Sequence, residues 1–238
     1  MKHLVLALLV ALTGCAGDID EQWQLDHDRI IAVRATPPRI VAGAQAQVDT
    51  LVGRKGGRPT EETPPAAQVV SPQSLATALR FDAGRWIVTA PDEARLAMAR
   101  TELGLPPGAP VPLLVGVAFP ETAFPSGLPD EPIAAIKTVW LGEAGDNPAL
   151  ETPTVDGVAA PPAPELVVAP LTDVPLSVEV GEHDDVNWLT SCGTMHDFDL
   201  PQAYLRVEAE DPTTGDLAVV VRNELGGVAW RVWSIRAE

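Results

Sequence analysis

Short runs of alternating apolar and polar residues, bounded by glycine or proline, are the feature that most restricts the fold of this chain. Residues 31–35 alternate in this way before Pro37 and Pro38, and residues 46–52 do so after Gly43. Alternation with a period of two is typical of a strand that buries one face. The chain also contains 24 prolines, which argue against a helical bundle because proline breaks helix interiors. We therefore expect an all-β fold.

Ten strands are predicted on this basis, and those of the second half recur at the spacing of roughly ten residues that is typical of a sandwich. They cover residues 31–35, 46–52, 85–89, 111–119, 134–141, 176–180, 186–191, 204–209, 217–222 and 228–235. The loop 223–227 (NELGG) ends in the glycines that a hairpin needs. Residues 53–74 lack periodicity and predict a long exposed loop. Its cations Arg54, Lys55 and Arg58 meet an acidic partner or a neighbouring copy of the chain, or are simply solvated.

One short helix is expected at about residues 90–103. Thr89 and Asp92 fit a capping box in which aspartate replaces the usual glutamate. Leu96 and Leu103 fall on one helical face, and Gly104 supplies a C-terminal stop.

A boundary between two domains is expected near residues 142–148 (GEAGDNP). The chain is long enough for one large core or two modest ones, and its lack of long helical runs favours two. We predict a first domain over 28–145, with the helix as an insertion, and a second over 146–238. The two halves show no convincing sequence repeat.

The first fifteen residues predict export. Residues 4–12 form an apolar run of about nine residues, and a helix that spans a bilayer needs roughly twenty, so the run has the size of a signal-peptide core. Residues 12–15 (LTGC) resemble the lipobox of bacterial lipoproteins. The resemblance implies that residues 1–14 are removed and that Cys15 carries diacylglycerol and an N-terminal acyl group such as palmitate. The alternative is an ordinary signal peptide with a chance cysteine.

Lipid on Cys15 would hold the chain at a membrane, because several acyl chains anchor a protein far better than one. In the sorting rule known for Gram-negative lipoproteins, aspartate after the cysteine retains the protein in the inner membrane. Ala16 stands there instead, which implies the outer membrane, on its periplasmic or cell-surface side. Residues 15–27 would then form an acidic spacer.

Three segments resemble immunoglobulin-like modules of uncharacterised lipoproteins from myxobacteria and related groups. They are residues 28–38 (DRIIAVRATPP), 188–195 (WLTSCGTM) and 219–230 (VVVRNELGGVAW). The chain departs from that pattern at Asn223, where an acidic residue is usual. The resemblance implies two immunoglobulin-like β-sandwich domains outside the cytoplasm, and no assigned activity.

Charge and cysteine content narrow the choice of partners. Loss of residues 1–14, which hold one lysine and no acidic residue, changes the formal net charge from −17 to −18. Such an acidic chain is repelled by nucleic acid, which we exclude as a partner. If Cys15 is acylated, Cys192 has no partner for an intramolecular disulfide.

The densest polar cluster spans residues 183–199 (HDDVNWLTSCGTMHDFD). One hypothesis makes it the zinc site of a metal-dependent hydrolase, and another gives it Ca²⁺. Its spacing matches no known metal motif, so an acidic loop beside a buried cysteine is the preferred interpretation, with no catalytic residue, metal or cofactor assigned. The zinc set is His183, Cys192 and His196, and the calcium set is Asp184, Asp185, Asp197 and Asp199.

Six tryptophans raise the hypothesis of a carbohydrate-binding surface, because exposed indole faces stack on sugar rings. Four of them lie in apolar strands and are expected in the core, namely Trp86, Trp140, Trp188 and Trp230. The sequence leaves the surroundings of Trp23 and Trp233 open.

We therefore expect a non-enzymatic binding or structural module, anchored to the outer membrane through Cys15, whose partner is an envelope protein or a polysaccharide. The alternatives are the metal-dependent hydrolase and the carbohydrate-binding module.

Overall fold

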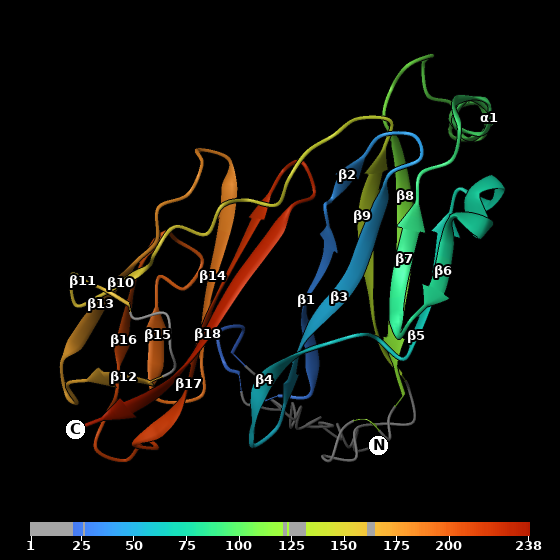
Figure 1. The fold of residues 1–238 in the computed structure, drawn as a ribbon. Coiled ribbons are helices and arrows are strands. Elements are labelled where there is room, and N and C mark those ends of the chain that lie inside the picture. Colours follow the sequence, from blue (N-terminus) through green and yellow to red (C-terminus); the bar gives the residue numbers. More distant parts are fainter. Residues whose placement is uncertain (1–20, 26, 121–122, 124–131, 161–164) are drawn as a thin grey trace, which may run out of the picture.

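The computed structural model describes residues 21–25, 27–120, 123, 132–160 and 165–238. Cys15 and the predicted signal peptide lie outside the described residues. The described chain is built almost entirely of strands, in two sandwiches (Figure 1), so the expected all-β, immunoglobulin-like fold is confirmed. Within these ranges, no helical stretch has the length and hydrophobicity that crossing a bilayer requires.

The first sandwich contains one sheet of five strands and one of four. The five-stranded sheet contains β1 (Arg29–Thr36), β3 (Gln45–Arg54), β4 (Gly57–Glu62), β6 (Leu79–Asp82) and β7 (Arg85–Thr89). Its order is β1-β3-β7-β6, with β4 also paired to β3. The other sheet contains β2 (Arg39–Ile40), β5 (Ala66–Ser71), β8 (Val111–Phe119) and β9 (Ile133–Leu141). Its order is β2-β9-β8-β5.

The second sandwich is also built from a five-stranded and a four-stranded sheet. The former contains β10 (Thr154–Val155), β11 (Val158–Ala159), β13 (Asp173–Ser177), β15 (Thr194–His196) and β16 (Gln202–Arg206), in the order β11-β10-β13-β16-β15. The latter contains β12 (Glu165–Val168), β14 (Asp184–Thr190), β17 (Thr214–Asn223) and β18 (Val228–Ala237), in the order β12-β18-β17-β14.

The two sandwiches share one topology. The order β1-β3-β7-β6 is repeated by β10-β13-β16-β15, and β2-β9-β8-β5 is repeated by β12-β18-β17-β14. In both, a short strand runs parallel to the last strand, as β2 does beside β9 and β12 beside β18. This is the immunoglobulin arrangement, in which strands A, B, E and D form one sheet and C, F and G the other. The fold thus contains a repeat that the sequence does not display.

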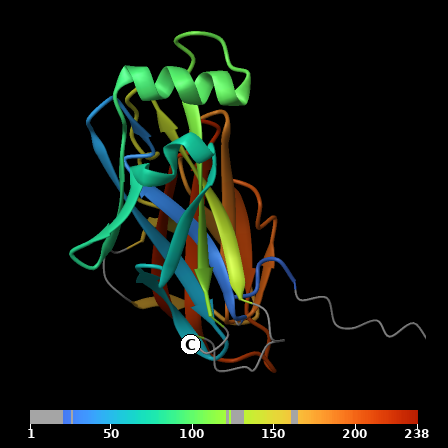
Figure 2. The ribbon, with the colours of Figure 1, turned by 90° about the vertical axis from the view of Figure 1, so that its right-hand side faces the viewer.

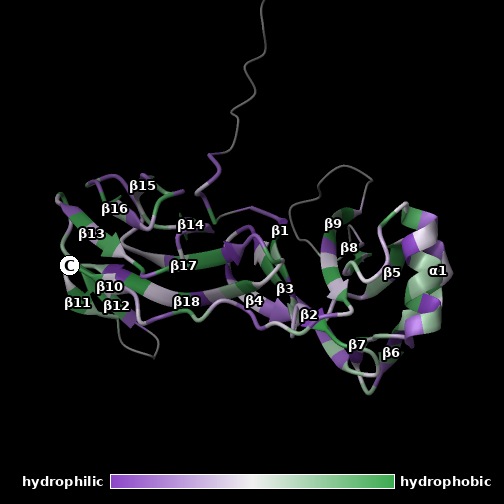
Figure 3. Cartoon of the chain, turned by 90° about the horizontal axis from the view of Figure 1, so that it is seen from above, coloured by the Kyte–Doolittle hydropathy of each residue, from purple (hydrophilic) through white to green (hydrophobic). Residues whose placement is uncertain are grey.

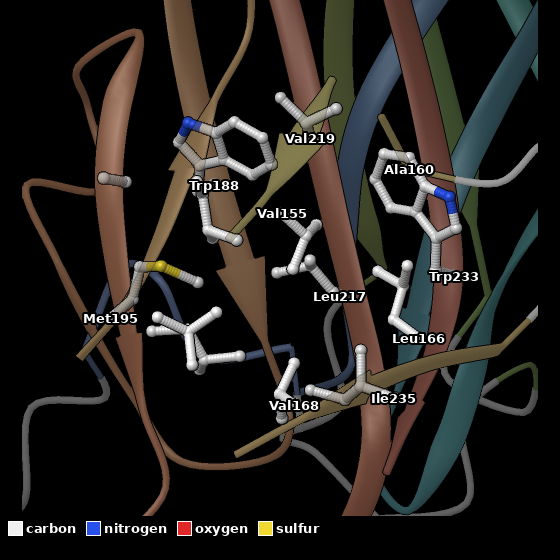
Figure 4. Close-up of a cluster of buried hydrophobic side chains, with 14 of the residues drawn as sticks. Val155, Ala160, Leu166, Val168, Trp188, Met195, Leu217, Val219, Trp233 and Ile235 are labelled. Atoms are coloured by element: carbon white, nitrogen blue, oxygen red, sulfur yellow. The ribbon is translucent and has the colours of Figure 1, made fainter. Parts of the chain in front are cut away.

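Each sandwich encloses a core between its sheets. Figure 4 shows the second core, in which Trp188 of β14 and Trp233 of β18 both lie among aliphatic side chains. Trp188 is 0 % exposed and Trp233 is 1 % exposed. The expected burial of Trp188 is therefore confirmed, and Trp233 proves to be its partner in the same core.

The predicted helix exists as α1 (Glu93–Leu103), which lies across one end of the first sandwich (Figure 2). Gly104 ends it with φ +67°, as expected. The predicted capping box at Thr89 is wrong: Thr89 ends strand β7, and the N-cap is Asp92, whose carboxylate accepts a hydrogen bond from the Arg95 amide at 3.0 Å.

Replacing Asp92 with alanine is expected to lower the free energy of unfolding by about 1 kcal/mol, because the Arg95 amide loses its acceptor. Urea unfolding followed by circular dichroism would measure the loss. Asp92→Asn keeps an acceptor and serves as the control. Equal stability of the alanine variant and the unmodified protein would contradict the cap assignment.

The predicted loop over residues 53–74 is wrong. Strand β4 pairs with β3 and strand β5 pairs with β8, and a 3₁₀ helix (Gln73–Ala78) follows. Strand β5 is exposed at every second residue and only half-buried at the others, and β4 is mostly polar. Both are held mainly by backbone hydrogen bonds to one neighbour, and such bonds impose no strict hydrophobic alternation.

Candidate functional site between the two sandwiches

The zinc site raised as an alternative hypothesis is not formed. Cys192 is fully buried, and its thiol donates a hydrogen bond to the Pro212 carbonyl at 2.8 Å. Burial, assisted by the charge of Asp211, raises the pKa of Cys192 to about 11, so it remains a thiol at neutral pH. His183 and His196 are exposed. Among the residues that the structure describes, no three histidine, cysteine or acidic side chains are placed to hold a metal ion. The hypothesis of a hydrolase built on this cluster is therefore wrong.

The calcium hypothesis fails for the same geometric reason. Asp184 shapes a turn, in which its carboxylate accepts a hydrogen bond from the Gly181 amide at 2.9 Å. Asp185 lies on β14, whereas Asp197 and Asp199 follow β15 in the other sheet of the sandwich. The four carboxylates do not form a cluster that could hold a cation.

The tryptophans do not form an exposed platform either, because all six are at least half-buried. Trp86 packs against the first core, and its indole donates to the Pro64 carbonyl at 2.8 Å. Trp23 packs against the second core. Trp230, expected in a core, lies between the two sandwiches instead, where the guanidinium of Arg34 stacks 3.9 Å above its ring centroid.

A third apolar cluster, called here the inter-sandwich cluster, joins the sandwiches through their outer faces. Strands β1 and β3 lie beside β14, β17 and β18 in Figures 1 and 3. Apolar residues on the outer faces explain this contact, since Ala32 of β1 and Ala218 and Val220 of β17 point away from the two cores. Its buried members are Leu25, Ala32, Leu51, Leu189, Ala218, Val220 and Val228.

The described part of the predicted spacer belongs to this interface. The Leu25 amide donates to the Thr190 carbonyl, and the Thr190 amide donates to the Trp23 carbonyl, both at 2.9 Å. Leu25 is only 1 % exposed. The expectation of a spacer that extends to residue 27 is therefore wrong: the chain is already docked on the second sandwich at Trp23.

Polar contacts reinforce the apolar cluster. Arg34 pairs with Asp49 and Glu61, and Glu61 also accepts a hydrogen bond from the Trp230 indole at 3.1 Å. Arg58 donates to the Ser234 hydroxyl at 2.7 Å. Arg58 thus bridges the sandwiches, and Arg54 pairs with Glu62 within the first. Two of the three cations in the predicted basic patch, Arg54 and Arg58, therefore make contacts within the molecule, and Lys55 is exposed.

Beside this cluster is a cavity of about 320 Å³, called here the inter-sandwich cavity. It is lined by β1, by β9 and by the hairpin that joins β17 to β18. Asn223 closes the hairpin by accepting a hydrogen bond from the Gly227 amide at 2.6 Å. Gly226 has φ +82°, and a Cβ there would lie 3.1 Å from the Trp140 indole nitrogen, so glycine permits the hairpin to approach the first sandwich.

Two cations line this cavity. Lys137 of β9 is 6 % exposed, and its ammonium donates to the Gly226 carbonyl across the interface. Arg222 of β17 donates to the Asn187 amide oxygen at 2.5 Å and to the Ile31 carbonyl at 3.0 Å. Burial, with a smaller contribution from the charge of Arg222, lowers the pKa of Lys137 to about 8. Burial also lowers the pKa of Arg222, and Asp185 opposes that shift.

Lys137 is not among the candidate site residues expected from the sequence, although the alternation along β9 places it at a buried position. Lys137 occupies the same face of β9 as Val139 and Leu141, which are fully buried. A lysine at a buried position of an alternating strand is unusual, because charged side chains are almost never buried without a partner.

No protein-family model matches this sequence, and no curated protein matches it. Solved structures are similar at low TM-scores. Fibronectin(III)-like modules of CbhA from Clostridium thermocellum have 11 % identity and a TM-score of 0.28, over 87 % of this chain and 94 % of theirs. The two tandem V-type regions of a v-region-containing chitin binding protein have 11 % identity and a TM-score of 0.33, over 87 % and 99 %.

A nucleoside hydrolase-related hypothetical protein from Saccharophagus degradans is also similar, at 13 % identity and a TM-score of 0.32 over 40 % of this chain. The chain spans only 26 % of the length of that protein. The fold assignment rests on strand order and on the parallel pairs β2–β9 and β12–β18. By these criteria, both halves of the chain are immunoglobulin-like β-sandwiches.

Proposed function

We propose that this chain is a non-enzymatic structural or binding module of the cell envelope, related to the lipoproteins of myxobacteria and attached to the outer membrane through lipid on Cys15. The observation that carries the proposal is the packing of one sandwich against the other. The inter-sandwich cluster and the bridges from Arg34 and Arg58 favour a single stiff body over two tethered ones. A stiff body presents its loops to an envelope protein or a polysaccharide in a fixed orientation.

The docked N-terminal segment supports a position close to the membrane. Only residues 16–20 separate Cys15 from Glu21, the first described residue. Such a stretch spans at most about 20 Å when fully extended. A lipid on Cys15 would therefore hold the sandwiches near the bilayer surface. The domain limits 28–145 and 146–238 stay a prediction.

Cys15→Ala is expected to abolish membrane attachment, because the lipid has no other thiol to join at that position. The protein would be expressed in a Gram-negative host that is fed tritiated palmitate, and cell fractions would be compared. We expect the unmodified protein to be labelled and to sediment with outer membranes, and the variant to be unlabelled and soluble. Cys192→Ala removes the other cysteine and should keep both label and location. A Cys15→Ala protein that stays labelled and membrane-bound would refute the anchor.

A further inference from the structure

The inter-sandwich cavity brings together two basic side chains on a strongly acidic molecule. Lys137 reaches it from β9 of the first sandwich and Arg222 from β17 of the second. The formal net charge of the chain is −17, so the charge of the molecule as a whole does not attract anions. Any attraction for an anion must come from these two side chains at short range.

Neither cation is neutralised by an ion pair among the residues that the structure describes. An ammonium group has three donors, and the one acceptor found for Lys137 is the neutral carbonyl of Gly226. Both acceptors of Arg222 are neutral as well. Asp185 lies opposite Arg222 on β14 and acts on it as a charge, without a hydrogen bond or an ion pair between the two side chains. Buried charges are normally paired, because the cost of removing them from water is otherwise uncompensated.

The geometry points to a binding site for a small oxyanion, a phosphate or a carboxylate group, held between Lys137 and Arg222 in the inter-sandwich cavity. Charge-assisted hydrogen bonds to such an anion are shorter and stronger than those to neutral carbonyls. The anion would replace the missing counter-charge, and it would contact both sandwiches at once.

The walls of the cavity agree with this class of ligand. About 320 Å³ is ample for a phosphate and sufficient for a sugar acid. Ile30, Ile31 and Val33 of β1 line the cavity together with Gly226 and Gly227 of the hairpin, so the lining is partly apolar and could accommodate the carbon skeleton of an organic acid. A neutral sugar would fit by size and would leave both charges uncompensated.

Titration calorimetry of the purified full chain would test the site with inorganic phosphate, D-glucuronate and D-glucose. D-glucuronate carries a carboxylate, and D-glucose does not. We expect phosphate, glucuronate or both to bind, with glucose at least tenfold weaker. Binding of phosphate without glucuronate would identify an inorganic or phosphorylated ligand, and the reverse would identify an organic acid; both outcomes support the site. Absence of binding by both anions at millimolar concentration would overturn it.

Two variants locate the binding. Lys137→Met removes the buried ammonium and should weaken anion binding at least tenfold. Lys55→Met removes the same charge from an exposed position and should leave binding unchanged. Equal binding by the Lys137→Met protein would show that the anion lies elsewhere and would refute the proposal.

An NMR titration of the unmodified protein tests the site without relying on the folding of a variant. The chain contains only three lysines, Lys2, Lys55 and Lys137. In protein labelled with ¹³C-lysine, the Cε resonance of Lys137 should titrate at lower pH than an ordinary lysine, because burial lowers its pKa to about 8. Saturation with the bound anion should raise the titration midpoint of Lys137. A midpoint of Lys137 that does not move would overturn the site.

Discussion

Replacing Ala218 with aspartate is expected to separate the two sandwiches while each keeps its own core. Ala218 is 0 % exposed and lies in the inter-sandwich cluster with Leu51 and Val220. A carboxylate there has no described basic partner in that cluster, and burying it unpaired costs about 3 kcal/mol or more. The neighbours of Ala218 on β17, Leu217 and Val219, point into the second core, so the change affects the outer face of the sheet.

Small-angle X-ray scattering and tryptophan fluorescence would measure this result together. Separation should increase the radius of gyration, whereas the fluorescence of the buried Trp188 and Trp233 should stay close to that of the unmodified protein. Residues 142–153, which connect the sandwiches, should also become more sensitive to protease. Ala134→Asp places the same charge at an exposed position of β9 and is the matched control.

An unchanged radius of gyration in the Ala218→Asp protein would contradict the idea that the apolar cluster holds the sandwiches together. The polar bridges made by Arg34 and Arg58 would then be sufficient by themselves. Loss of Trp188 fluorescence would instead mean that the second sandwich depends on the first for its folding. The first result would assign the stiffness of the two-sandwich body to the polar bridges, and the second would make the folding of the second sandwich dependent on the first.

The central strands could be predicted from the sequence, because each has a sandwich core on one side. The bounds of β7 and β8 match the predicted residues 85–89 and 111–119. The short strands β2, β6, β10, β11, β12 and β15 were not predicted. They have two to four residues, and most lie at sheet edges, where pairing through the backbone imposes little on the side chains.

The candidate site could not be predicted from proximity in sequence. The cluster at 183–199 looked dense because its residues are neighbours along the chain. Strand β14 belongs to one sheet and β15 to the other, so the chain changes sheets between Thr190 and Thr194, and no three of the candidate ligand side chains come together. Conversely, Lys137 and Arg222 are 85 positions apart in the sequence, and only the packing of the two sandwiches brings them together.

Lys137→Met is expected to stabilise the protein at pH 7. Burial lowers the pKa of Lys137 from an ordinary 10.5 to about 8, so the folded protein holds a charge that its surroundings disfavour. A difference of this size corresponds to about 3 kcal/mol, at about 1.4 kcal/mol per pKa unit. Loss of the hydrogen bond to Gly226 offsets about 1 kcal/mol of this gain in the free energy of unfolding. The variant should therefore gain about 2 kcal/mol in the free energy of unfolding.

The sign of the pH dependence follows from the lowered pKa of Lys137. Between about pH 8 and pH 10.5 the unfolded chain binds more protons at this site than the folded one, so the stability of the unmodified protein rises with pH. Methionine does not titrate. The advantage of the Lys137→Met protein should thus be complete below pH 8 and should disappear as the pH approaches 10.5.

Urea unfolding at pH 7 and at pH 10 would measure both proteins, with Lys55→Met as a control whose stability should stay within about 0.5 kcal/mol of the original. The buffer must contain neither phosphate nor a carboxylate, because an anion bound at Lys137 would stabilise the unmodified protein by mass action and hide the effect. Two results would show that the ammonium of Lys137 is well compensated in the folded state. Either the Lys137→Met protein is less stable than the unmodified protein at pH 7, or the difference in the free energy of unfolding between the two proteins is the same at both pH values. In that case the cavity would need no anion to balance it.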